Sequence, residues 1–141
     1  MTTLAVGPAQ TRGFALTAFA SFDFADVIVA TTGVGVEVFR LPLGATAMGG
    51  YLSVGTVFNS GTSDSLELGD ATDDNRYLAA TDAQAAADSE LLGNLLGYKV
   101  VAADRPVLLE WTAVGAVPTT GAGSILMLYA DPEYNTINYE S

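Results

Sequence analysis

Residues 51–68, YLSVGTVFNSGTSDSLEL, carry the clearest β pattern in the chain. Side chains alternate between residues 51 and 58, so one face of an extended strand receives Leu52, Val54, Thr56 and Phe58. The turn-forming residues 59–62 follow, and beyond them Leu66 and Leu68 face one way while Ser65 and Glu67 face the other. We therefore predict two half-buried strands joined as a hairpin.

Further short runs of apolar and β-branched residues predict strands elsewhere in the chain. We expect them at residues 26–32, 34–41, 98–102, 107–113 and 124–130. Thr32-Gly33 would turn between the first two of these strands, and residues 118–121 would join the last two. The run at 124–130 is apolar on both faces, which is typical of a central strand. Residues 82–96 are rich in Ala and Leu, and either a short helix or an irregular crossover fits them.

Seven or eight short strands with turn residues between them indicate an all-β fold rather than a βαβ fold. We predict a single β-sandwich or jelly-roll-like domain with an extended N-terminal arm and at most one short helix. The 141 residues suffice for one domain with a sizeable core. We divide the chain into an arm and first strand region (1–22), a β-sandwich domain (23–131) and a C-terminal tail (132–141).

The amino-acid composition limits the classes of molecule that we expect the chain to bind. Sixteen acidic residues against five basic ones give a net charge of −11, which disfavours binding to nucleic acid and to anionic membranes. The apolar stretch 14–30 is interrupted by Asp23 and Asp26, so it does not predict a membrane span. Half of the residues are apolar and only 15% are charged, which favours a surface partly covered by a partner. The N-terminus lacks a basic segment, so we expect a soluble, unprocessed protein made in the cytoplasm.

Catalytic chemistry finds little support in the residues. The chain has no His and no Cys, and it lacks a P-loop, a G-x-S-x-G elbow and a G-x-G-x-x-G motif. A carboxylate pair could serve glycoside hydrolysis, but with sixteen acids any chosen pair is uninformative. We predict that the chain is not an enzyme and has no cofactor.

The densest polar cluster is Asp70, Asp73, Asp74 and Asn75, with Asp64 as a further candidate across the predicted hairpin. Oxygen ligands at this spacing suit Ca²⁺, but the EF-hand spacing is missing and the same residues form Asx-turns. Arg76 follows the cluster directly, and we favour a bidentate ion pair with it over a metal site. We expect no resident metal, and calcium remains the less favoured alternative.

The first dozen residues have no period and contain Gly7-Pro8 and Gly13, so they predict an extended arm or a frayed end. If the arm binds a partner, the candidate contact residues are Leu4, Val6, Pro8, Arg12 and Phe14. Phe14, Phe19 and Phe22 are either anchors on the partner or core residues, and we favour the core. Trp111 and Tyr98 fit core or interface positions better than a sugar-stacking platform.

Residues 41–45, 49–54 and 58–82 together resemble head decoration, or cement, proteins of tailed bacteriophages. The clearest part is FNSGTSDSLELGDATDDNRYLAATD at 58–82, and the resemblance extends from about residue 36 to residue 129. The family-like pattern ends in strands matched by 107–111 and 125–129, whereas the Ala- and Leu-rich insert at 83–96 departs from it.

The resemblance implies a structural virion protein on the outer surface of the phage head, made in the host cytoplasm. It implies binding to the major capsid protein at inter-capsomer junctions, self-association as a homotrimer, and no catalytic residues. Two alternatives remain open: a carbohydrate- or receptor-binding β-module of a phage tail or fibre, and a tail-tube subunit.

Overall fold

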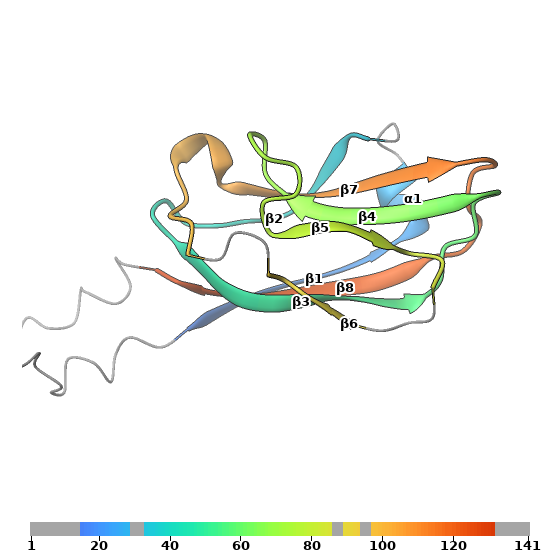
Figure 1. Cartoon of the computed structure of the whole chain (residues 1–141). Coiled ribbons are helices and arrows are strands. Elements are labelled where there is room, and N and C mark those ends of the chain that lie inside the picture. Colours follow the sequence, from blue (N-terminus) through green and yellow to red (C-terminus); the bar gives the residue numbers. More distant parts are fainter. Residues whose placement is uncertain (1–14, 29–32, 86–88, 94–96, 132–141) are drawn as a thin grey trace, which may run out of the picture.

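The computed structural model describes residues 15–28, 33–85, 89–93 and 97–131, whose strands form two stacked antiparallel sheets (Figure 1). The β1 sheet contains, in spatial order, β1 (Leu16–Asp23), β8 (Ala122–Ala130), β3 (Thr46–Thr56) and β6 (Ser89–Leu91). The β2 sheet contains β2 (Gly35–Arg40), β7 (Pro106–Val114), β4 (Ser63–Gly69) and β5 (Leu78–Asp82). A single-turn α1 (Phe24–Ile28) and a 3-10 turn η2 (Ala102–Asp104) lie between strands. The predicted all-β sandwich is confirmed.

The strand order is that of one long antiparallel hairpin rolled into a sandwich. β1 pairs with β8, β2 with β7, β3 with β6, and β4 with β5. Additional pairing of β3 with β8 and of β4 with β7 completes the two sheets. This is the jelly-roll arrangement. Its innermost turn, between β4 and β5, is the acidic segment that follows residue 69.

The core lies between the sheets and is filled by side chains that alternate inward. The largest contributions come from β3, β8, β4 and β7, with Leu52, Val54, Ile125, Met127, Leu66, Leu68, Val107, Leu109 and Trp111 all buried. The predicted inward faces of 51–58 and 65–68 are confirmed except at Thr56, which is exposed after a register shift in β3. β8 lies between β1 and β3, so its predicted central position is also confirmed.

The hairpin predicted within residues 51–68 is wrong, although its two strands exist. β3 and β4 belong to opposite sheets, and residues 57–62 carry the chain from one sheet to the other. The crossing is tied inside the protein, where the buried Phe58 donates its amide to the carbonyl of Ala83 at 2.9 Å. An alternating pattern sets the buried face of a strand but not its partner, so it cannot separate a hairpin from a crossing.

The strand predicted at 26–32 is wrong for residues 26–28, which lie in α1. The Asp26 amide donates to Asp23 Oδ1 at 3.1 Å, and the Asp23 amide donates to Asp26 Oδ2 at 2.9 Å. These reciprocal bonds resemble a capping box and favour a helical turn over the β-branched content of the segment. Residues 29–32 lie outside the described residues, and the strand predicted at 34–41 is present as β2.

Residues 98–102 differ from the prediction, and residues 82–96 decide between its two alternatives. Residues 98–102 form no strand beyond one isolated bridge between Lys99 and Thr46, because Val100 bonds instead with the loop at Gly44 and Ala45. The described part of 82–96 contains the short strand β6 and no helix, which favours the crossover alternative. The expected turn at 118–121 connects β7 to β8 across the two sheets.

β1 spans the predicted division at residue 22, so residues 16–22 pair within the sandwich. Residues 1–14 and 132–141 lie outside the described residues. No helix among the described residues has the length and apolar character needed to cross a bilayer.

Candidate functional site

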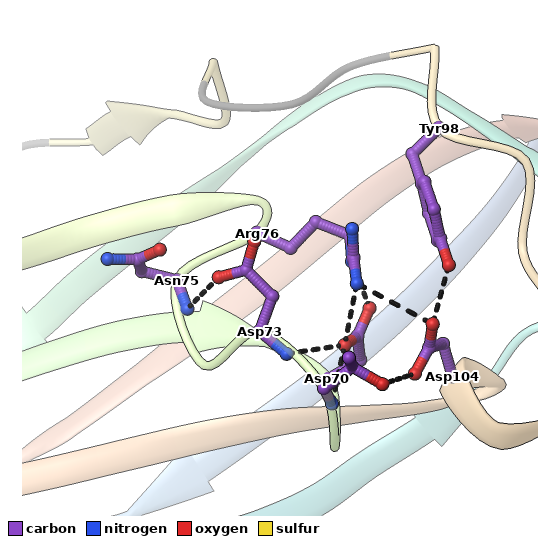
Figure 2. A network of polar contacts seen from close by, with 7 residues as sticks. Asp70, Asp73, Asn75, Arg76, Tyr98 and Asp104 are labelled. Atoms are coloured by element: carbon purple, nitrogen blue, oxygen red, sulfur yellow. Dashed lines mark hydrogen bonds and ion pairs between the residues drawn. The ribbon is translucent and has the colours of Figure 1, made fainter.

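A buried ion pair closes the loop between β4 and β5 (Figure 2). Arg76 donates through Nε and Nη2 to the two carboxylate oxygens of Asp70, with 3.2 Å between Nη2 and Oδ1. The same carboxylate accepts the backbone amides of Thr72 and Asp73, each at 3.0 Å. The Arg76 side chain is 8% exposed and that of Asp70 is fully buried. The predicted pairing of Arg76 with the acidic run is therefore confirmed.

Asp104 extends this ion pair into a network that ties the β4–β5 loop to η2. Asp104 Oδ2 lies 3.5 Å from Arg76 Nη2 and accepts the Tyr98 hydroxyl at 2.5 Å, while the Thr72 hydroxyl donates to Oδ1. Hydrogen bonds from Thr72 and Tyr98 hold the pKa of Asp104 below its ordinary value. The guanidinium carbon of Arg76 lies 3.7 Å from the Tyr98 ring centroid, a cation–π contact. We call these five residues, Asp70, Thr72, Arg76, Tyr98 and Asp104, the Arg76 network.

Tyr77 lies next to this network in the chain and is fully buried. Burial raises the pKa of its hydroxyl to about 12. Among the described residues, this hydroxyl is the buried side-chain polar atom without a hydrogen-bond partner. It is therefore neutral at physiological pH and has no activated character.

A second buried carboxylate, Asp64, lies at the start of β4. It accepts the Trp111 indole N–H at 2.7 Å, the Ser60 hydroxyl at 2.6 Å, the Ser60 amide at 2.8 Å and the Gln84 side-chain amide at 2.7 Å. Burial alone would raise the pKa of Asp64, but these donors together hold it below its ordinary value. This set of bonds ties Trp111 into the core, so Trp111 is not available as a sugar-stacking platform.

A third group of carboxylates lies on the outer side of the β2 sheet. Glu67 of β4 and Glu110 of β7 are directly opposite each other, and Asp74 approaches both, with one oxygen of each residue within 4.8 Å of the others. Burial, followed by the charges of Asp74 and Glu110, raises the pKa of Glu67. Burial and the charge of Asp74 raise the pKa of Glu110. We call these three residues the Glu67 cluster.

These contacts show where the candidate calcium ligands lie and what each of them binds. Asp70 is bound to Arg76, Asp74 belongs to the Glu67 cluster, and the Asp73 carboxylate accepts the Asn75 amide at 3.3 Å. Asp64 is bound in its own set of contacts with Ser60, Gln84 and Trp111. The four predicted ligands are thus divided between different partners, and the calcium site stays an untested alternative.

The predicted partner contacts Leu4, Val6, Pro8, Arg12 and Phe14 lie outside the described residues. Of the other two candidate anchors, Phe22 is buried in the core, whereas Phe19 is 62% exposed. The sequence reasoning missed two residues of these networks, Asp104 and Gln84. Asp104 lies far along the chain from Arg76, and Gln84 lies far from Asp64. No local spacing signals such contacts.

Two open hollows lie on the described surface. One of about 390 Å³ is lined by β1, α1 and β2, including Phe22, Asp26 and Glu37. The other, of about 420 Å³, lies beside the β4–β5 loop and includes Asp73, Asp74 and Glu110. The residues lining them supply carboxylates, hydroxyls and apolar groups, without a cation opposite the acids. We assign no reaction to either hollow.

No family model matches the chain, and no curated protein matches its sequence. Among solved structures, a chain of the cyanophage Pam1 capsid asymmetric unit matches with a TM-score of 0.73 and 23% identity, over 93% of this chain and 94% of that chain. A chain of the acid-stable capsid of Helicobacter pylori bacteriophage KHP30 matches with a TM-score of 0.59 and 20% identity, over 86% and 90%. The likeness shows a shared fold, and both neighbours are parts of phage capsid structures.

Proposed function

We propose that this chain is a structural protein of a phage head, which binds the outer surface of the assembled capsid and stabilises it at inter-capsomer junctions. The observation that carries the proposal is the match over nearly the whole length of both chains to a component of a phage capsid asymmetric unit. The resemblance of residues 58–82 to head decoration proteins points in the same direction.

The proposed mechanism is mechanical. A packaged genome presses outward on the head, and a protein that bridges neighbouring capsid subunits adds buried area that must be lost before they separate. Binding to the assembled lattice but not to free subunits stabilises the lattice by mass action. Many equivalent sites make the total effect large. The partner would be the major capsid protein, and a homotrimer would match a local threefold axis of the shell.

The interior of the fold suits a protein that must keep its shape under mechanical stress. Asp64, Arg76 and Asp104 are buried and bound by partners from other segments of the chain, and the buried Asp70 is bound by Arg76 within its own loop. Such saturated contacts tend to fix a single conformation, which a repeated lattice contact requires. We therefore expect the role to be binding and bracing, without turnover of a substrate.

The N-terminal arm is the proposed point of attachment, through Leu4, Val6, Pro8, Arg12 and Phe14. The first 14 residues contain no acid and one Arg, in contrast to the rest of the chain. Removing residues 1–12 should weaken attachment to purified heads while leaving the melting temperature unchanged. Undiminished attachment of this truncated chain would contradict the arm assignment.

The main experiment adds the purified chain to heads of the encoding phage that were made without it. We expect saturable binding with one chain or trimer per equivalent junction, followed by an increased temperature of head rupture. Sedimentation measures the copy number, and genome release on heating measures the stabilisation. No binding to heads, or only a few copies confined to the tail, would contradict the proposal and favour a tail module.

A further inference from the structure

The outer face of the β1 sheet carries an apolar row that crosses all four strands. The strand register aligns Phe19 of β1 with Leu126 of β8, Leu126 with Tyr51 of β3, and Tyr51 with Leu91 of β6. The side chains of this row point outward, because Ile125 and Met127, which flank Leu126 on β8, point inward and are buried in the core. Phe19 is 62% exposed and Leu91 is 78% exposed, at the two edges of the sheet.

Two more residues widen this row into a patch. Met48 is 54% exposed beside a register shift in β3, and the half-buried Leu128 follows Leu126 on the same side of β8. We call the six residues Phe19, Met48, Tyr51, Leu91, Leu126 and Leu128 the β1-sheet patch. On the other side of the row, Ser21, Ser124 and Ser53 align across β1, β8 and β3 and supply hydroxyl groups. An apolar centre with a polar rim is the usual composition of a protein interface.

Charge separates this face from the opposite one. β1, β3 and β8 contain a single charged residue, Asp23, at the last position of β1. β6 adds Glu90, at the register position opposite the core residue Leu52. The strands of the β2 sheet instead carry Glu37, Arg40, Glu67 and Glu110 on or near their outer side, with Asp74 above them. In a chain of net charge −11, the β1-sheet patch can therefore lose its water without burying a charge. A partner also meets little local repulsion there.

The area of this face can be compared with the area that a stable protein–protein interface buries. Four strands spaced about 4.8 Å apart, with about eight residues at about 3.3 Å each, cover roughly 500 Å². A stable pair of proteins typically buries about 800 Å² on each partner. A single such face is thus small for a solution dimer, but it is sufficient where many equivalent contacts act together on one lattice.

We propose that the β1-sheet patch docks flat against an uncharged, apolar surface of the assembled capsid shell, with the acidic outer face of the β2 sheet directed to solvent. This inference rests on the proposed function and names the surface that performs it.

The test compares three full-length chains for binding to heads made without this protein. The first is wild type, the second carries Phe19→Asp with Leu91→Asp, and the third carries Val114→Asp as the matched control. Val114 is 57% exposed and lies at the end of β7 in the β2 sheet, so the control adds a charge at similar exposure on the other sheet. Circular dichroism and melting temperature verify that each variant folds. If the double aspartate variant does not fold, Phe19→Ser with Leu91→Ser takes its place.

We expect the patch variant to bind heads about tenfold more weakly or worse, and the Val114→Asp variant to stay within about twofold of wild type. Wild-type binding together with undiminished binding of the patch variant would overturn the docking face and leave the proposed function standing. Absence of wild-type binding would overturn both. A wild-type dimer in analytical ultracentrifugation that the patch variant abolishes would assign the face to a second copy and also overturn the inference.

Discussion

At the scale of single residues, a buried carboxylate at each end holds β4 in place. Asp64 is the second residue of the strand and binds Trp111, Ser60 and Gln84, while Asp70 follows the strand and binds Arg76. Several hydrogen-bond donors stabilise each carboxylate, because an unpaired buried charge would cost several kcal/mol. These residues give the innermost strand pair of the roll a defined position.

Replacing Arg76 by Met tests the strength of the Arg76 network. The substitution keeps much of the side-chain volume but leaves Asp70 and Asp104 without their cation, so we expect a loss of about 3–5 kcal/mol in the free energy of unfolding. Urea denaturation measures it. The control Arg40→Met breaks the exposed Arg40–Glu37 pair, which water and salt screen, so it should cost far less than Arg76→Met. Equal effects of the two substitutions would contradict the assigned role.

The Glu67 cluster predicts a pH dependence of stability. The pKa values of Glu67 and Glu110 are raised in the folded chain, which therefore binds protons more tightly than the unfolded chain. This contribution to stability is complete below the ordinary value of 4.5 and is lost as the pH rises through the raised pKa values. Glu110→Gln should therefore stabilise the chain at neutral pH by about 0.5 kcal/mol and have little effect below about pH 4.

Urea midpoints measured across this pH range check the expectation. Glu37→Gln is the control, because the hydrogen bond from Arg40 lowers the pKa of Glu37 instead. The control should bring no gain at neutral pH. A Glu110→Gln variant that is less stable than wild type at neutral pH would show that the carboxylates attract a cation or a donor instead of repelling each other.

At the scale of elements, the β4–β5 turn depends on close backbone packing. A Cβ added at Gly69 would lie 2.1 Å from the Asp73 carbonyl oxygen and 2.3 Å from the Asp74 carbonyl carbon. Only a residue without a side chain lets the loop fold back over the end of β4. The sequence places Gly69 directly before the acidic run, and the structure shows why a glycine is needed there.

Gly69→Ala should therefore displace the loop and destabilise the chain by about 1–3 kcal/mol. Gly49→Ala is the matched control, because a Cβ at Gly49 meets no atom within 4 Å. Thermal unfolding of both variants gives the comparison. A Gly69→Ala variant as stable as Gly49→Ala would mean that the loop can move away at little cost.

At the scale of the whole molecule, charge and apolar surface are divided between the two sheets. The jelly roll gives each sheet one outer face, and the acids of β4, β7 and the β4–β5 loop gather on one side while the β1-sheet patch lies on the other. A net charge of −11 carried by 141 residues also means that the folded chain repels itself.

Added salt should therefore stabilise the isolated chain. Raising NaCl from low concentration to about 0.5 M screens the repulsion, and a gain of about 1 kcal/mol would raise the melting temperature by about 4 °C. Differential scanning calorimetry at both salt concentrations measures the shift. The double variant Glu67→Gln with Glu110→Gln should respond less. A fall in melting temperature with added salt would mean that favourable ion pairs outweigh the repulsion.

The strand alternation at 51–58 and 65–68, the central position of 124–130 and the pairing of Arg76 with the acidic run could be predicted from the sequence. Each follows from local chemistry: alternation sets the buried face, apolar residues on both sides require cover, and a buried acid requires a nearby cation. The Asp23-x-x-Asp26 cap was also present in the sequence, but the β-branched residues beside it favoured a strand.

Only the tertiary structure decided which strands are partners and which residues meet from a distance. It separated β3 from β4 into opposite sheets, brought Asp104 to Arg76 and Gln84 to Asp64, and aligned Phe19, Leu126, Tyr51 and Leu91 across four strands. The physical reason is that alternation has the same period in every strand, so it fixes the direction of a side chain and leaves its neighbours to the packing of the whole chain.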